Sequence, residues 1–303
     1  MVARAVSSVH GVLLFDKDVG VSSNGALQSV RRLYGRAKAG HTGTLDPLAS
    51  GLLPICFGEA TKFAHVLLAA PKSYQATLKL GFKSSTGDAE GEVVAVSPPA
   101  FAAAHLDAVL GRYRGRISQT PPVHSALKHN GRPLYAYARA GIEVERQARQ
   151  VEIIELAMRD LVDDELSISV TCSKGTYIRT LAQDIGEDLG CGAYLTALRR
   201  TATAQFGIAE ACDLERLQGL DATGRAEVVL PIDVLLNGMP SLCFAEEQAS
   251  KLMCGQAVTY SVDVLPGEYR LYGPGKVFLG VGSALAQARI APQRMVSASS
   301  VNA

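Results

Sequence analysis

Two segments of the chain alternate apolar and polar residues with a period of two, the pattern of a β-strand with one buried face. The apolar side of the first is made by Tyr74, Ala76, Leu78 and Leu80. The second has Leu166, Ile168, Val170 and Cys172, and it continues into a helical pattern made by Ile178, Leu181, Ile185 and Leu189. Half-exposed strands suit antiparallel or mixed sheets better than the fully buried strands of a parallel α/β fold. We therefore expect such a sheet with helices packed on it.

The remaining pattern interleaves strands and helices without a regular βαβ rhythm, which predicts an α+β domain on a mixed or antiparallel sheet. We expect strands at residues 11–15, 50–58 and 92–96, helices at 24–35, 61–68, 101–110 and 133–140, and a mixed segment at 195–206. The strand at 92–96 suits a partner for the first alternating strand. From Pro240 onward Gly and Pro punctuate short apolar runs, which predicts a small β-rich domain. The expected division is residues 1–236 and 240–303.

Composition indicates an ordinary globular protein, with 48% hydrophobic and 19% charged residues. No apolar run reaches the roughly 18 residues of a membrane span, and no signal peptide precedes the first strand. We therefore expect a cytoplasmic protein. The six cysteines are scattered without metal-ligand spacing, which favours reduced thiols over a metal site or a disulfide framework.

Positive charge is concentrated in residues 19–142, where fourteen Lys and Arg face six acids. The net charge of this stretch is therefore +8, in a chain whose total is +1. Residues 108–142 contain no acid, but they contain Arg112, Arg114, Arg116, Lys128, Arg132 and Arg139. This asymmetry suits a surface that binds a polyanion such as nucleic acid, and a basic solvated surface without a partner is the alternative.

The segment GHTGTLDPLASGLLP, residues 40–54, places Asp46 between a Gly- and Thr-rich loop and an apolar strand. Gly40 and Gly43 allow the loop to approach a ligand closely, and Pro47 restrains the backbone directly after the carboxylate. His41 lies five residues upstream of Asp46. The alternative is a structural Asp-Pro turn in which the carboxylate caps local N–H groups.

The segment CSKGTYIRT, residues 172–180, lies where the second alternating strand enters its helix. Tyr177 and Arg179 are two residues apart, so they do not share a helix face, but a strand-to-helix turn allows them to converge. Burial raises the pKa of a carboxyl and an adjacent guanidinium lowers it. An Arg179–Asp46 pair at about 4 Å would gain roughly 4 kcal/mol at an effective dielectric of 20. A surface arginine and a core tyrosine are the alternative.

Two further positions suit contact with RNA. Tyr74 begins an alternating strand and is able to stack on a base, with filling of the core as the alternative. Lys128 follows Ser125 in the acid-free stretch and is able to contact phosphate, with a solvated lysine beside a turn as the alternative. P-loop, HExxH, Gly-x-Ser-x-Gly and dinucleotide-binding motifs do not occur.

Together these strings resemble the TruB family of tRNA pseudouridine synthases, bacterial type. The resemblance runs from about residue 11 to residue 200. It includes GVLLFDKDVGVSSN, AGHTGTLDPLASGLLPICFGEATK, KSYQATLKLG, TGDAEG, SALK, GRPLYAYARAGIEV and CSKGTYIRTLAQDIGEDLGCGAYLTALRR. The C-terminal part is similar to the small RNA-binding PUA domain of that family through LMCGQAV and its Gly-rich strands.

The resemblance implies isomerisation of uridine to pseudouridine at position 55, in the T-loop of tRNA, without a cofactor or metal. By motif, Asp46 becomes the nucleophile, Arg179 its partner, and Tyr74 a group that stacks on the flipped base and serves as a base in proton removal. The substrate-binding residues implied are His41, Tyr177, Leu198, Asp88 and Lys128. It further implies a monomer that binds the T-arm of tRNA without a protein partner.

Two alternatives remain open at this stage. The same scaffold suits a non-catalytic RNA-binding or tRNA-folding module, and it suits a synthase guided by a partner RNA. One departure from the family is visible, because Lys17 is followed by Asp18 where the family commonly has proline. Attack on carbon 6 of the base and attack on the ribose require the same carboxylate.

Overall fold

The computed structural model describes residues 9–125, 127–138 and 140–298. Arg139 of the acid-free stretch, and residues 1–8 and 299–303 of the two expected domains, therefore lie outside the described residues.

The larger sheet is mixed, as the sequence predicts, and has ten strands within the described residues. Along its path the strands are β14 (Val229–Leu230), β1 (Gly11–Lys17), β3 (Ala49–Phe57), β12 (Ala193–Thr203), β4 (Lys72–Leu80), β11 (Glu165–Cys172), β10 (Arg149–Val162) and β7 (Gly115–Gln119). Off this path, β13 (Phe206–Gly207) pairs with β12, and β2 (Ala39–His41) pairs with β3. Neighbours along the path are antiparallel except β3 and β12, which are parallel. This parallel junction lies in the middle of the sheet, beside the Asp46 loop.

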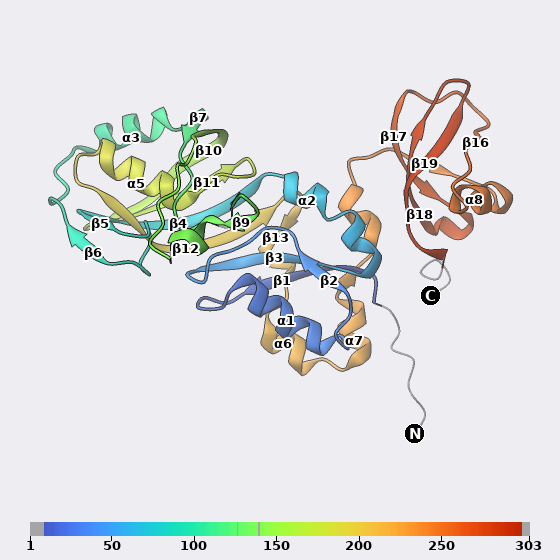
Figure 1. Ribbon diagram of the computed structural model, residues 1–303, viewed down its shortest axis with the longest axis horizontal. Coiled ribbons are helices and arrows are strands. Elements are labelled where there is room, and N and C mark those ends of the chain that lie inside the picture. Colours follow the sequence, from blue (N-terminus) through green and yellow to red (C-terminus); the bar gives the residue numbers. More distant parts are fainter. Residues whose placement is uncertain (1–8, 126, 139, 299–303) are drawn as a thin grey trace.

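Two groups of helices cover the two halves of the sheet (Figure 1). The helices before the C-terminal part are α1 (Ser23–Leu33), η1 (Gly58–Lys62), α2 (His65–Ala69), α3 (Ala103–Arg112), α4 (Leu134–Ala138), α5 (Ile178–Asp188), η2 (Ile208–Glu210), α6 (Leu214–Gly219), α7 (Ala222–Glu227) and η3 (Ile232–Leu236). One buried cluster joins α3 and α5 to β4, β10 and β11, and a second joins α1 to β1 and β3. Tyr74 and Leu198 pack against both clusters, so the seam between them is where a site can open.

Helix α5 shows why the local sequence folds as predicted. Its residues Ile178, Leu181 and Ile185 are buried on one face, and Gly190 follows its end with φ +75°. Helix α1 is capped by Ser22, whose side chain accepts a hydrogen bond from the Gly25 N–H at 3.1 Å. The predicted strands at 11–15 and 50–58 are likewise present as β1 and β3.

Two predicted elements differ from the structure. The strand expected at 92–96 is β6 (Val93–Ala95), and it pairs with β5 (Phe82–Ser84) instead of with β4. Both edges of β4 are already occupied, by β11 and β12. The segment read as mixed at 195–206 is mostly the long strand β12, whose register shifts at Leu195/Ala197 and at Arg200/Ala202 break the period of two.

The C-terminal part forms a separate five-stranded sheet at the far end of the molecule (Figure 1). Its order is β15 (Ser241–Cys243), β17 (Gly267–Tyr272), β18 (Phe278–Ala284), β19 (Arg289–Met295) and β16 (Val258–Thr259), accompanied by α8 (Glu246–Met253) and η4 (Pro274–Lys276). Lys62 Nζ donates to the Met295 carbonyl at 2.9 Å, and the Tyr272 hydroxyl bonds Asp233 Oδ2 at 2.7 Å, so the two parts are in contact. None of the described helices is long and apolar enough to cross a membrane.

Candidate active site

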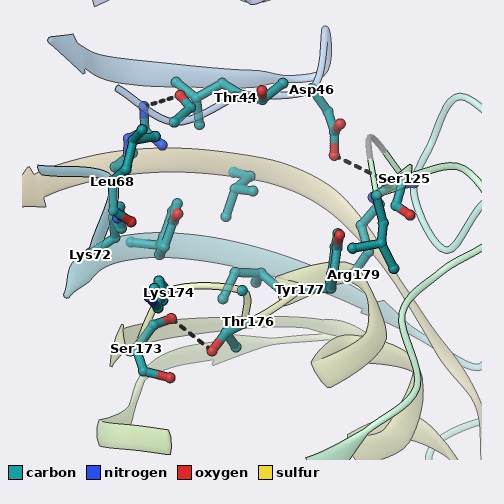
Figure 2. A pocket seen from close by; sticks show the side chains of 18 residues that line it. Thr44, Asp46, Leu68, Lys72, Ser125, Ser173, Lys174, Thr176, Tyr177 and Arg179 are labelled. Atoms are coloured by element: carbon teal, nitrogen blue, oxygen red, sulfur yellow. Dashed lines mark hydrogen bonds and ion pairs between the residues drawn. The ribbon is translucent and has the colours of Figure 1, made fainter. Parts of the chain in front are cut away.

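A cavity of about 350 Å³ opens at the seam between the two halves of the sheet, and Figure 2 shows the side chains around it. Five of the predicted site residues line it, namely Asp46, Tyr74, Tyr177, Arg179 and Leu198. They come from the loop before β3, from β4, from the start of α5 and from β12. The structure therefore brings together residues that are more than 150 positions apart in the chain.

The register of the sheet explains how this convergence arises. Leu198 on β12 lies opposite Ala49 on β3 and opposite Ala76 on β4. The Asp46 carbonyl accepts the Ala49 N–H at 3.0 Å, so the carboxylate is held at the start of β3. Tyr74 lies one residue pair away from Ala76 on the same face of β4, which places its ring near the Asp46 loop.

Asp46 and Arg179 form an ion pair, as the sequence predicts, with 2.9 Å between Oδ2 and Nη2. The guanidinium also lies 3.3 Å from Asp88 through Nη1, and its side chain is 6% exposed. It further donates to the carbonyl oxygens of Thr86 at 3.2 Å and His124 at 2.8 Å. These contacts hold Arg179 on several sides, and its Nη2 faces the carboxylate of Asp46.

The pKa of Asp46 is raised above its ordinary value. Burial against the pocket wall is the largest cause, although 40% of the side chain remains exposed to the cavity. Arg179 lowers the pKa and Asp88 raises it, so the second carboxylate offsets part of the effect of the guanidinium. As predicted, burial and Arg179 shift the pKa of Asp46 in opposite directions, and the effect of burial is the larger.

Tyr177 is the N-cap residue of α5, and Gln119 at the end of β7 fixes its backbone. The Tyr177 N–H donates to Gln119 Oε1 at 2.7 Å, and Gln119 Nε2 donates to the Tyr177 carbonyl at 3.1 Å. Through these two hydrogen bonds the buried side-chain amide of Gln119 holds the strand-to-helix turn. Because of this turn, Tyr177 and Arg179 both reach the same cavity, although they do not share a helix face.

Tyr74 is half-buried in the lining of the cavity. Burial raises the pKa of its phenol above the ordinary value, and the positive charge of Arg200 offsets only part of that rise. The thiol of Cys172 and the carboxylate of Asp46 act in the raising direction. A tyrosine in these surroundings is positioned both to stack on a flat ring and to exchange a proton with it.

Three predicted residues do not line this cavity. Asp88 is buried behind Arg179, where its carboxylate also accepts a hydrogen bond from the Thr86 hydroxyl at 2.5 Å. Lys128 is exposed on the hairpin of β8 (Lys128–His129) and β9 (Arg132–Pro133), next to the lining residue Leu127. His41 lies on β2, where burial and then Arg200 lower the pKa of its ring. Asp88 therefore supports Arg179 from behind, and His41 and Lys128 lie outside the cavity.

Sequence reasoning missed three buried polar residues of the lining, namely Lys72, Ser125 and Arg200. Lys72 is buried, and its ammonium donates to the carbonyl oxygens of Leu67, Leu68 and Ala70; burial lowers its pKa to about 8. Ser125 has a buried hydroxyl with no partner among the described residues. Arg200 is buried, and a signal for it exists, because Arg199 and Arg200 adjoin on one strand and must point to opposite faces.

The part of the chain that the structure describes holds neither a metal-binding cluster nor a disulfide. Within residues 9–125, 127–138 and 140–298, no group of three His, Cys, Asp or Glu side chains is arranged to hold a metal ion. The six cysteines are free thiols, and four of them are buried. Burial raises the pKa of Cys172 to about 11, so this thiol beside the site motif is held in its neutral form.

Family models match nearly the whole chain. Residues 31–178 match the N-terminal domain of the TruB family pseudouridylate synthases, and residues 179–237 match the tRNA pseudouridylate synthase B C-terminal domain. Residues 240–296 match the C-terminal model of pseudouridine synthase II TruB.

Full-length relatives show the same likeness. The chain is 50% identical over 291 residues to the tRNA pseudouridine synthase B of Chromobacterium violaceum, with 95% of each chain covered. It is 48% identical over 293 residues to the tRNA pseudouridine synthase B of Methylobacillus flagellatus, with 97% of each covered.

Solved structures with this fold include a Cbf5–Nop10–Gar1 complex, with a TM-score of 0.68 and 22% identity over 94% of this chain and 82% of the other. The archaeal box H/ACA sRNP Nop10–Cbf5 complex gives a TM-score of 0.69 and 20% identity, covering 95% of this chain and 86% of the other. At these identities the likeness shows the fold, and it confirms the predicted mixed-sheet synthase scaffold with a separate β-rich C-terminal part.

Proposed function

Because the chain belongs to the TruB family of pseudouridine synthases, we propose that it isomerises uridine 55 in the T-loop of tRNA to pseudouridine. The observation that carries this function is the Asp46–Arg179 ion pair in the wall of a cavity that also contains Tyr74. A carboxylate held by one guanidinium supplies a nucleophile, and an aromatic ring beside it supplies a surface on which a flipped uracil stacks.

The reaction is an isomerisation, so its atoms balance within the nucleotide. The bond between N1 and C1′ breaks, the base rotates, and C5 bonds to C1′; the C5 proton leaves and N1 gains a proton. Asp46 supplies the nucleophile, whether it adds to C6 of the base or to the ribose. Arg179 favours the ionised carboxylate, which is needed because burial alone opposes it.

The other residues bind and orient the base. Tyr74 stacks on the uracil and accepts the proton from C5, while Tyr177 and Leu198 form the walls around it. Asp88 acts through Arg179, since its carboxylate is 2% exposed and meets the guanidinium at 3.3 Å. His41 and Lys128 contact the RNA outside the cavity. Flipping a nucleotide costs a few kcal/mol, which this stacking and the phosphate contacts of the basic stretch offset.

We further propose the domain roles, the oligomeric state and the cellular location of the enzyme. Residues 1–236 form the catalytic domain, and residues 240–303 form a PUA-like domain that adds RNA contacts. The enzyme binds the T-arm as a monomer, with no guide RNA or protein partner and without a cofactor. It acts in the cytoplasm, where its tRNA substrate is found.

The proposal is tested with the purified chain and a T-arm stem-loop transcript, with no other macromolecule added. We expect pseudouridine at the position equivalent to 55 and nowhere else in the transcript. A matched transcript with cytidine at that position is the control and should gain none. Binding without isomerisation would indicate a non-catalytic RNA module, and activity only after adding a guide RNA would indicate a guided synthase.

A further inference from the structure

Arg200 on β12 is a buried cation in the wall of the catalytic cavity. Its side chain is 1% exposed, yet it belongs to the lining. Among the ion pairs of the described residues, none includes Arg200. Burying a charge without an opposite charge costs folding free energy, so other contacts must stabilise this guanidinium. We therefore expect Arg200 to have a role in the site.

Two of those contacts enclose the segment that carries Asp46. Arg200 Nε donates to the Leu52 carbonyl of β3 at 2.6 Å, and Nη2 donates to the Gly43 carbonyl at 3.0 Å. Gly43 has φ +119°, a conformation that suits glycine, and it lies three residues before Asp46. The guanidinium of Arg200 therefore binds the chain on both sides of Asp46, at Gly43 before it and at Leu52 after it.

The same guanidinium acts on Tyr74 across the sheet. Arg200 and Tyr74 are partners in the β12–β4 register. The positive charge of Arg200 lowers the pKa of the Tyr74 phenol, against a burial effect that raises it. Cys172 on β11 and Asp46 on its loop also act on this phenol, and the buried ammonium of Lys72 lies on the same strand. Of these groups, Arg200 is the cation that lowers the pKa of the Tyr74 phenol.

We propose that Arg200 is a positioning residue that fixes the Asp46 segment and stabilises the phenolate of Tyr74 as it accepts the C5 proton of uracil. In that step the C5–H bond breaks, its electron pair returns to the uracil ring, and the proton adds to the phenolate oxygen, which later releases it to water. This inference rests on the proposed function and adds a residue to it. Arg200 itself touches carbonyl oxygens and acts through its neighbours.

The test compares Arg200→Met, which removes the charge, with Arg200→Lys, which keeps it. Arg199→Met is the matched control, because Arg199 is the next residue on the strand, is 41% exposed and pairs with Asp16 outside the cavity. For each variant, kcat and KM on tRNA are measured between about pH 6 and pH 9.5. Ionisation of the RNA affects all variants equally, so each profile is compared with that of Arg199→Met.

We expect Arg200→Met to lower kcat at neutral pH by about 100-fold, the usual size of a general-base contribution, with KM within about threefold. The pKa of the Tyr74 phenol is raised above its ordinary value of 10.0, so its titration is followed directly by ultraviolet absorbance in RNA-free protein, as the difference from Tyr74→Phe. This titration should move to higher pH in Arg200→Met, because the phenol has lost the cation beside it. Arg200→Lys should leave the titration in place and lower kcat by about 10-fold, because an ammonium does not reproduce the hydrogen bonds of the planar guanidinium. A purely structural residue would not separate the two variants in this way.

Two results would overturn the inference. One is a folded Arg200→Met variant whose Tyr74 titration and kcat match those of Arg199→Met; the other is a loss found entirely in KM. Should Arg200→Met fail to show a cooperative thermal transition, Arg200→Lys decides, and wild-type kcat in that variant would contradict the positioning role. Absence of product from the wild-type enzyme would instead count against the proposed function itself.

Discussion

Oδ2 of Asp46 lies 2.9 Å from Nη2 of Arg179, so the candidate nucleophile is held by a guanidinium whose side chain is 6% exposed. The other terminal nitrogen of the same guanidinium meets Asp88. One buried cation thus serves two carboxylates, of which only Asp46 faces the cavity. This sharing fixes the geometry of Asp46. Burial raises the pKa of Asp46, and Asp88 offsets part of the lowering effect of Arg179.

Removing Asp88 should destabilise the fold. Asp88→Ala leaves Arg179 with Asp46, which is 40% exposed, as its one carboxylate partner, and it removes the carboxylate acceptor 2.5 Å from the Thr86 hydroxyl. Breaking a buried pair in this way costs about 3–5 kcal/mol. Chemical denaturation should show this loss. Asp164→Ala, which removes the partly exposed partner of Lys79, is the control and should cost much less, because water and salt screen an exposed ion pair. Equal losses in the two variants would show that the Asp88 pair is not structurally special.

Asp46→Asn should stabilise the fold increasingly as the pH rises. The folded-state pKa of Asp46 is raised above its unfolded value, so the folded state favours the protonated carboxyl and loses that advantage as pH rises through the folded pKa. The variant removes this ionisation and leaves Arg179 paired with Asp88. Because the side chain is 40% exposed, the gain at pH 7.5 should not exceed about 1 kcal/mol. Denaturation at pH 4.5 and pH 7.5 measures it, and a gain that shrinks with pH would contradict the sign.

Much of the site could be predicted because its residues lie in segments with strong local patterns. Asp46, Tyr74 and Arg179 each adjoin a strand or a helix start that the periodicity of the sequence indicates. Their convergence needed more than periodicity, since it depends on the parallel pairing of β3 with β12. The likeness to a known family supplied that long-range information.

Residues whose roles depend on register could not be predicted. Gln119 fixes Tyr177 from 58 positions away, and nothing in its local sequence indicates this. The adjacent Arg199 and Arg200 must point to opposite faces of their strand, but its bulges hide the alternation that would have shown which of the two is buried. The strand at residues 92–96 was assigned to the wrong partner for a related reason, because the edges of β4 are taken by strands far along the chain.

Asp184 on α5 should make the protein less stable as pH rises from about 4 to about 6. Burial and then the neighbouring Glu187 and Asp188 raise its pKa to about 6, whereas an unfolded chain has an aspartate pKa of about 3.9. Between these values the folded state binds more protons than the unfolded state, so the stabilising effect of the proton is lost across this window. Asp184→Asn should therefore stabilise by roughly 1 kcal/mol at pH 7.5, allowing for solvent screening, and by nothing at pH 3.5.

Thermal unfolding at the two pH values checks the Asp184 prediction. The exposed Asp263→Asn serves as the control and should leave the transition unchanged at both. A benefit of Asp184→Asn that is equal at pH 3.5 and pH 7.5 would mean that it does not come from ionisation.

Gly51→Ala should be among the most damaging small substitutions. Gly51 has φ +101°, and an added Cβ would lie 2.3 Å from the Arg200 carbonyl oxygen on the neighbouring strand. The backbone of β3 or β12 would have to move, which we expect to cost about 3 kcal/mol or more. In contrast, Gly219→Ala at the end of α6 meets nothing within 4 Å and should be neutral or slightly stabilising. Denaturation curves that rank the two variants in the opposite order would be inconsistent with the β3–β12 packing.

The most direct test of the account measures tritium release from tRNA labelled at carbon 5 of uridine, using the wild type and Asp46→Asn side by side. Release requires the C5–H bond to break, so it reports the isomerisation and not RNA binding. We predict stoichiometric release from uridine 55 by the wild type and a loss of at least about 1,000-fold in Asp46→Asn, with tRNA binding retained. Release by Asp46→Asn at the wild-type rate would show that Asp46 is not the nucleophile.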